Sequence, residues 1–139
     1  MAQTDPDPAL EWELRRAGEA GVFQPGELLV ETELAGMGRN SGALVVTDRR
    51  VLFVSTGLFR RLRKMKVTSV DLPDIQHAET RAVWGMRDTA GLVLTVARGG
   101  APREAIELAD VSGGLARATQ IAESIFREQA RLRRRQSPG

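Results

Sequence analysis

The sequence predicts a mainly β fold, in which a strongly bent, seven-stranded antiparallel sheet is capped by one C-terminal helix and preceded by a short helix. Between residues 27 and 110, short runs rich in Val, Leu, Ile and Thr are separated by Gly, Pro, Asp and Asn, as in an antiparallel meander. Beyond Asp110 the apolar period changes from two to about 3.6. The 139 residues, 42% of them apolar, suffice for one core.

We expect three parts along the chain: a helical extension over residues 1–22, one domain over 23–132 and a basic flexible tail over 133–139. The first helix is expected over residues 9–18, because three apolar residues share one face and Pro8 suits a first helical position. These three residues are Leu10, Leu14 and Ala17. Trp12 is expected to help pack this helix against the sheet.

The strands begin after Pro25-Gly26, a pair typical of a type II turn because proline presets φ and glycine takes the positive φ. Seven runs have strand character: residues 28–34, 42–47, 51–55, 65–70, 75–80, 92–97 and 104–108. The second and third form the clearest hairpin, with a tight polar turn in which the Asp48 carboxylate can accept backbone N–H groups.

A helix of about five turns is expected at the C-terminus, capped by Asp110 or Ser112 and ending in arginines that favour the helix dipole. Its apolar stripe must be buried, and the interior of the bent sheet is the large apolar surface available to it. The stripe comprises Leu115, Ala118, Ile121, Ala122, Ile125, Phe126, Gln129 and Leu132.

The order of these motifs resembles the bacterial pleckstrin-homology domains, especially the YokE-like and GRAM-related branch. The matching segments, within residues 23–130, are Pro25-Gly26-Glu27, the hairpin Leu44-Val45-Val46-Thr47-Asp48-Arg49-Arg50-Val51-Leu52-Phe53, Gly57-Leu58-Phe59 and the helix 116–126. The resemblance implies a seven-stranded barrel with a capping helix. The resemblance implies little about function beyond a tendency of such domains to form oligomers. Because the chain also lacks catalytic groups and opposes an acidic N-terminal block to a basic central one, we expect a non-catalytic binding or assembly module that acts through protein–protein contacts, including self-association.

Basic residues are concentrated in residues 39–66, which hold eight Arg and Lys against Asp48 alone, whereas residues 1–38 hold eight acids and two arginines. A cluster within the basic block is a candidate contact for anionic lipid or an acidic protein, since such groups bind phosphate and carboxylate. The alternative is a solvated face that protects a sheet edge. The cluster comprises Arg60, Arg61, Arg63, Lys64 and Lys66.

Two further residues are candidates for the same contact. Arg39 is the one basic residue of the expected first hairpin loop, residues 35–41. Eukaryotic relatives that bind phosphoinositides carry their ligand residues around that loop. A single basic residue there therefore argues against specific phosphoinositide recognition. Trp84 lies in the loop between the fifth and sixth strands and either anchors a membrane or partner contact or covers the barrel rim. The arginines of residues 131–135 are expected to form a frayed helix end, not a nucleic-acid contact.

We expect no enzyme activity, cofactor, metal or small-molecule substrate. The chain has no Cys and one His, His77, in an expected strand, so neither a thiolate site nor a histidine pair is available. Gly36-Met37-Gly38 lacks the pattern of a nucleotide-binding loop and is expected to be a turn. Without an apolar stretch of about 18 residues or a signal peptide, we expect a cytoplasmic location.

Overall fold

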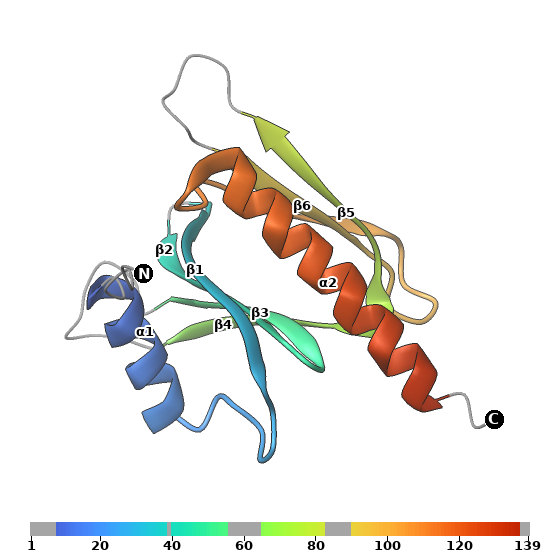
Figure 1. The fold of residues 1–139 in the computed structure, drawn as a ribbon, viewed down its shortest axis with the longest axis horizontal. Helices are drawn as coiled ribbons and strands as arrows, with labels where there is room; N and C mark the ends of the chain where they lie inside the picture. The colour runs from blue at the N-terminus through green and yellow to red at the C-terminus, as the bar shows by residue number, and fades with distance from the viewer. Residues whose placement is uncertain (1–7, 39, 56–64, 83–89, 137–139) are drawn as a thin grey trace, which may run out of the picture.

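The computed structural model describes residues 8–38, 40–55, 65–82 and 90–136 (Figure 1). Two antiparallel sheets carry the seven predicted strands. The first sheet has the order β1 (Leu29–Met37), β2 (Asn40–Thr47), β3 (Arg50–Ser55) and β4 (Lys66–Asp71). The second has the order β5 (Ile75–Ala82), β6 (Ala90–Val96) and β7 (Glu104–Leu108). The remaining elements are the helices α1 (Pro8–Glu19) and α2 (Gly114–Gln136) and the 3₁₀ turn η1 (Leu72–Asp74).

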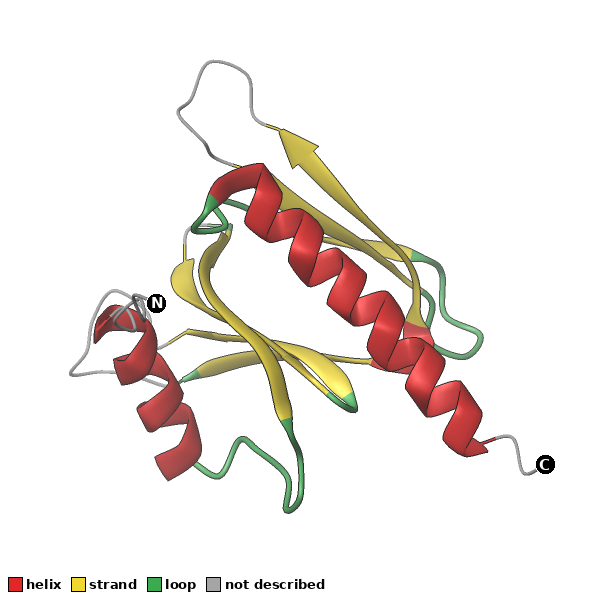
Figure 2. Ribbon diagram, in the orientation of Figure 1, coloured by secondary structure: helices red, strands yellow, loops and turns green. Residues whose placement is uncertain are grey.

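The predicted architecture is confirmed: α2 lies across the opening between the two sheets, and α1 lies against the first sheet, away from α2 (Figure 2). The connection from the first sheet to the second is η1, where Pro73 follows the last strand of the first sheet. At the other side, Gly36 of β1 and Ala109 exchange two backbone hydrogen bonds of 2.7 Å. The two sheets are therefore joined through β1 and the end of β7.

The first hairpin differs from the prediction. Residues 35–41 were expected to form a loop, yet β1 continues to Met37 and β2 begins at Asn40, with Gly36 paired to Ser41. Gly36 is thus a strand residue and not a turn residue, whereas Gly38 has the positive φ of 61° that a turn requires. The glycines interrupt the apolar alternation, which is why the sequence pattern ends the strand too early.

The run Ala43–Val46 of β2 is apolar without interruption because both faces of the strand are buried there. Leu44 and Val46 point into the core between the sheets, and Ala43 and Val45 belong to a second apolar cluster that includes Leu10 and Ala17 of α1. Helix α1 is therefore docked on the outer face of the first sheet. Trp12 is half-buried, with the guanidinium carbon of Arg16 5.9 Å from its ring centroid.

The space between the sheets is filled by side chains. Four residues of the predicted α2 stripe are buried there: Ala118, Ile121, Ala122 and Ile125. Among the described residues, a cavity between the sheets has a volume of about 10 Å³, close to the space that one water molecule needs. That cavity is too small for an organic ligand.

Helix α2 departs from the prediction at two residues of the stripe and at its C-terminal end. Leu115 and Phe126 were expected to be buried but are 48% and 42% exposed. Phe126 follows Ile125 directly, and one residue turns the helix by about 100°, so its side chain lies at the border of the buried face. The helix also continues to Gln136, so residues 133–136 of the expected flexible tail are helical.

Candidate binding surface

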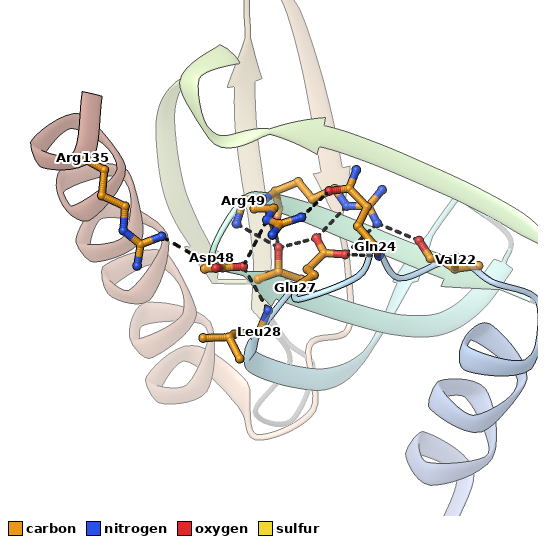
Figure 3. Close-up of polar contacts among 9 residues, drawn as sticks. Val22, Gln24, Glu27, Leu28, Asp48, Arg49 and Arg135 are labelled. Carbon is orange, nitrogen blue, oxygen red and sulfur yellow. Dashed lines mark hydrogen bonds and ion pairs between the residues drawn. The ribbon is translucent and has the colours of Figure 1, made fainter. Parts of the chain in front are cut away.

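A buried ion pair connects the segment before β1 to the turn between β2 and β3 (Figure 3). Arg50 donates two hydrogen bonds of 2.8 Å from Nε and Nη2 to the two carboxylate oxygens of Glu27. Its Nη2 also donates to the carbonyl oxygen of Val22 at 2.7 Å. The Glu27 side chain is 0% exposed and that of Arg50 11%, so each charge depends on the other for its stabilisation.

The turn beside this pair differs from the prediction. We expected the Asp48 carboxylate to accept the N–H groups of its own turn, but the Thr47 hydroxyl oxygen accepts them, from Arg49 at 3.1 Å and Arg50 at 3.0 Å. Asp48 instead accepts the backbone N–H of Leu28 at 3.0 Å. Asp and Thr side chains can both accept the N–H groups of a tight turn. Here Thr47 does so, and the Asp48 carboxylate reaches the residue before β1.

The charges of Glu27 and Arg50 are satisfied by hydrogen bonds within the chain, and these bonds join the segment before β1 to the β2–β3 hairpin. Hydrogen bonds from Arg50, from the backbone N–H of Gln24 and from the Thr47 hydroxyl lower the pKa of Glu27 from 4.5 to about 2, although burial acts in the opposite direction. The carboxylate therefore stays ionised at neutral pH. Because general acid–base catalysis needs a group that titrates near the working pH, Glu27 does not suit that role.

The predicted type II turn is confirmed, with Gly26 at φ 76° and Glu27 N donating to Gln24 O at 3.1 Å.

A second charged cluster fixes the start of α2 to β1. Arg117 forms ion pairs with Glu31 and with Glu33, the latter at 2.9 Å, and donates to the Thr32 carbonyl oxygen at 3.1 Å. Burial lowers the pKa of Arg117, but the hydrogen bonds to Glu33 and Glu31 outweigh burial and raise it. The guanidinium is thus fully engaged by its own chain.

An open groove lies where the C-terminal turns of α2 pass the start of β5. It has a volume of about 370 Å³, and the side chains that line it come from η1, the first residues of β5 and one side of α2. They are Leu72, Pro73, Ile75, Gln76, Phe126, Gln129, Leu132, Arg133 and Gln136. We call this site the α2–β5 groove.

Gln129 fixes the floor of the α2–β5 groove. Its Nε2 donates to the carbonyl oxygens of Leu72 and Ile75, both at 2.8 Å, so the helix and the strand are held at a set distance. Phe126 projects from the helix beside this floor and is partly exposed. The walls of the groove are therefore fixed, and Phe126 provides exposed apolar surface in it.

A second hollow, of similar volume, lies at the turn between β6 and β7 and is lined by Val96, Arg98, Ala101, Pro102, Arg103 and Glu104. Arg98 and Glu104 face each other there at 3.8 Å and neutralise one another. This hollow has no aromatic side chain and fewer large apolar residues than the α2–β5 groove. It is the weaker candidate.

The structure describes only one residue of the predicted basic cluster. Lys66 is the first residue of β4, an outer strand of the first sheet, and it is exposed. His77 lies in β5 as predicted, on an exposed face where its Nε2 is 3.7 Å from a Glu79 carboxylate oxygen. The other predicted contact residues lie outside the described residues: Arg39, Arg60, Arg61, Arg63, Lys64 and Trp84.

Within the described ranges, no group of three or more His, Asp or Glu side chains is arranged to hold a metal ion. No helix in the same ranges has both the length and the apolar character needed to cross a membrane.

The arrangement of two sheets and a capping helix has counterparts among solved structures. A pleckstrin homology domain from Shewanella amazonensis SB2B superposes with a TM-score of 0.56 at 18% identity, over 93% of this chain and 94% of that chain. The fold is pleckstrin-homology-like. A DUF1696 family protein with a pleckstrin-homology domain, from Shewanella loihica PV-4, superposes with a TM-score of 0.54 at 17% identity, over 84% and 92% of the two chains.

At these identities the likeness is one of fold, and it confirms the pleckstrin-homology-like barrel that the sequence motifs implied. No protein-family model matches the chain, and no curated protein matches it either. Fold by itself does not define a function or a ligand.

Proposed function

We propose that this chain is a non-catalytic binding and assembly module that acts through protein–protein contacts. The observation that carries the proposal is the contrast between interior and surface. The cavity between the sheets that the described residues enclose has a volume of about 10 Å³, whereas an open groove of about 370 Å³ lies outside the barrel. A contact at the surface therefore suits this molecule better than a ligand enclosed by the barrel.

The strongest polar clusters described above do not compete with this proposal, because they are satisfied within the chain. Glu27 pairs with Arg50, and Arg117 pairs with Glu31 and Glu33. We also propose membership of the YokE-like and GRAM-related branch, supported by the Pro25-Gly26-Glu27 turn and by the hairpin that binds it.

Two measurements on the full chain test the proposal together. Light scattering over a concentration series, at low and at high salt, reports self-association. Co-sedimentation with vesicles of phosphatidylcholine and phosphatidylserine reports lipid binding, to which exposed basic residues such as Lys66 would contribute on the order of 1 kcal/mol each.

We expect a molar mass that rises with protein concentration, and little sedimentation with anionic vesicles. A strict monomer at every concentration that sediments with anionic vesicles at low salt, and is released at high salt, would contradict the proposal. That result would favour peripheral membrane binding through the basic cluster and Trp84.

A further inference from the structure

We propose that two copies of this chain associate by exchanging α1, so that the α1 helix of each copy docks on the outer face of the first sheet of the other copy. This inference rests on the proposed function and names the segment and the surface through which the copies join. Three features carry it: the face on which α1 docks, the turn that follows α1, and two exposed leucines beside that turn.

The outer face of the first sheet is apolar and is covered by a helix. Four residues of β2 and β3, each 0% exposed, form its centre: Ala43, Val45, Leu52 and Val54. Helix α1 places Leu10 and Ala17 against them, at 9% and 0% exposure. A bare face of this kind would expose a contiguous apolar patch to water, so the sheet favours a docked helix. The α1 helix of a second copy has the same fit to this face as the chain's own.

One glycine sets the direction in which the chain leaves α1. Gly21 has a positive φ of 73°, and its N–H donates to the carbonyl oxygen of Gly18 at 3.1 Å. Val22 N donates to the carbonyl oxygen of Ala17 at 3.0 Å. Together these bonds form a Schellman motif, in which the glycine takes the left-handed conformation. In an extended conformation, which glycine also adopts readily, Gly21 would direct α1 away from its own sheet and towards a second copy.

The chain is anchored directly after this turn, so the rest of the domain keeps its structure when α1 moves. Arg50 Nη2 donates to the carbonyl oxygen of Val22 at 2.7 Å and to Glu27 at 2.8 Å. The exchange therefore needs a change of conformation only between Glu19, where α1 ends, and Val22.

Two exposed leucines beside the anchor supply a second contact between the copies. Leu28 and Leu29 follow Glu27 directly and are 63% and 43% exposed. The segment from Glu19 to Val22 spans at most about 11 Å when it is extended, so the anchored segments of two exchanging copies must lie close together. The leucines would then be shielded from water at the point where the chains cross.

The test measures the self-association of the full chain and of three variants by light scattering over a concentration series. Gly21→Val opposes the left-handed conformation of the turn and should favour exchange. Gly100→Val is the matched control, because both glycines have a positive φ and no atom of the described residues lies within 4 Å of an added Cβ. The third variant adds Ala17→Asp to Gly21→Val, so that α1 can dock on neither copy. Circular dichroism verifies that each variant is folded.

We expect the molar mass of the wild type to rise with concentration towards that of a dimer. Gly21→Val should strengthen dimerisation about a hundredfold, because the left-handed turn becomes about tenfold less favourable in each of the two chains. Gly100→Val should change dimerisation less than about twofold, because its turn does not join α1 to the sheet. The variant that also carries Ala17→Asp should be monomeric.

A distance between two spin labels distinguishes the exchange of α1 from any other dimer. The chain has no Cys, so Glu11→Cys on α1 and Ser41→Cys on β2, both at exposed positions, provide two defined label sites. The doubly labelled Gly21→Val chain is diluted with an excess of unlabelled Gly21→Val chain. The distance between the two labels should be longer in this dimer than in the monomer, because α1 of the labelled chain docks on the unlabelled copy.

An unchanged label distance in the dimer, or equal dimerisation of Gly21→Val and Gly100→Val, would overturn this inference. Either result leaves the proposed function standing, with self-association through another surface. A wild type that stays monomeric at every concentration would overturn the inference as well. If that monomer also sediments with anionic vesicles, the proposed function falls with it.

Discussion

At the scale of single residues, the Glu27–Arg50 pair joins the turn before β1 to the β2–β3 hairpin. Two parallel 2.8 Å hydrogen bonds and the Thr47 hydroxyl satisfy the Glu27 carboxylate in a position with no access to water. Such a pair adds little net stability compared with apolar residues of the same shape, but removing one partner leaves a buried, uncompensated charge.

We therefore predict that Arg50→Met lowers the free energy of unfolding by about 3–5 kcal/mol. Arg15→Met, at an exposed position of α1, is the control and should change it by less than about 0.5 kcal/mol. Urea denaturation followed by circular dichroism measures both. A loss below about 1 kcal/mol for Arg50→Met would show that the pair is not buried as described.

The same pair predicts a pH dependence. The pKa of Glu27 is lowered from 4.5 to about 2 in the folded chain, so its stabilisation is fully present above pH 4.5 and is lost as the pH falls from 4.5 towards 2. Wild-type stability should fall more steeply over this window than that of Glu27→Gln, by a total on the order of 3 kcal/mol. Glu11→Gln, at an exposed site, should keep the wild-type slope. Parallel curves for wild type and Glu27→Gln would contradict the assignment.

At the scale of elements, two contacts decide how closely the strands and helices approach. In the β2–β3 pair, the backbone of β3 passes so near Gly42 that a Cβ there would lie 2.1 Å from the carbonyl oxygen of Val54. On the other face of the same sheet, Ala17 of α1 is fully buried against β2 and β3. Both positions require a small residue because of packing and not because of local propensity.

Gly42→Ala should therefore destabilise the protein by about 2 kcal/mol or more, since the strands must separate to admit the methyl group. Gly18→Ala is the matched control, because no atom lies within 4 Å of its added Cβ and it belongs to a helix. It should leave stability unchanged or raise it by up to about 1 kcal/mol. Thermal unfolding of the two variants compares them directly, and equal melting temperatures would argue against the close approach.

Ala17→Asp tests whether α1 is docked. A carboxylate at this buried position should cost about 3 kcal/mol or release the helix, which would expose the apolar outer face of β2. Ala20→Asp, at an exposed position just beyond the helix, should have little effect. Limited proteolysis measures whether α1 is released from the sheet. We expect rapid cleavage before residue 23 in the Ala17→Asp variant alone. Equal resistance of both variants would contradict the docking.

At the scale of the whole molecule, local patterns predicted the architecture and tertiary contacts determined the groove. The hairpin through Asp48 and the change of period beyond Asp110 depend on residues that are close in sequence. The number of strands and the position of the C-terminal helix could therefore be predicted from them. The α2–β5 groove depends on η1 meeting α2 across more than 50 residues of sequence, as in the Gln129 bond to Leu72, where the separation is 57 residues.

The most direct test of the proposed protein–protein contact is a proton–nitrogen NMR dilution series of the full chain. We expect chemical shifts of surface residues to change with protein concentration, while those of the buried core near Leu94 do not. Chemical shifts that are independent of concentration, together with changes around Lys66 when anionic vesicles are added, would contradict the proposal.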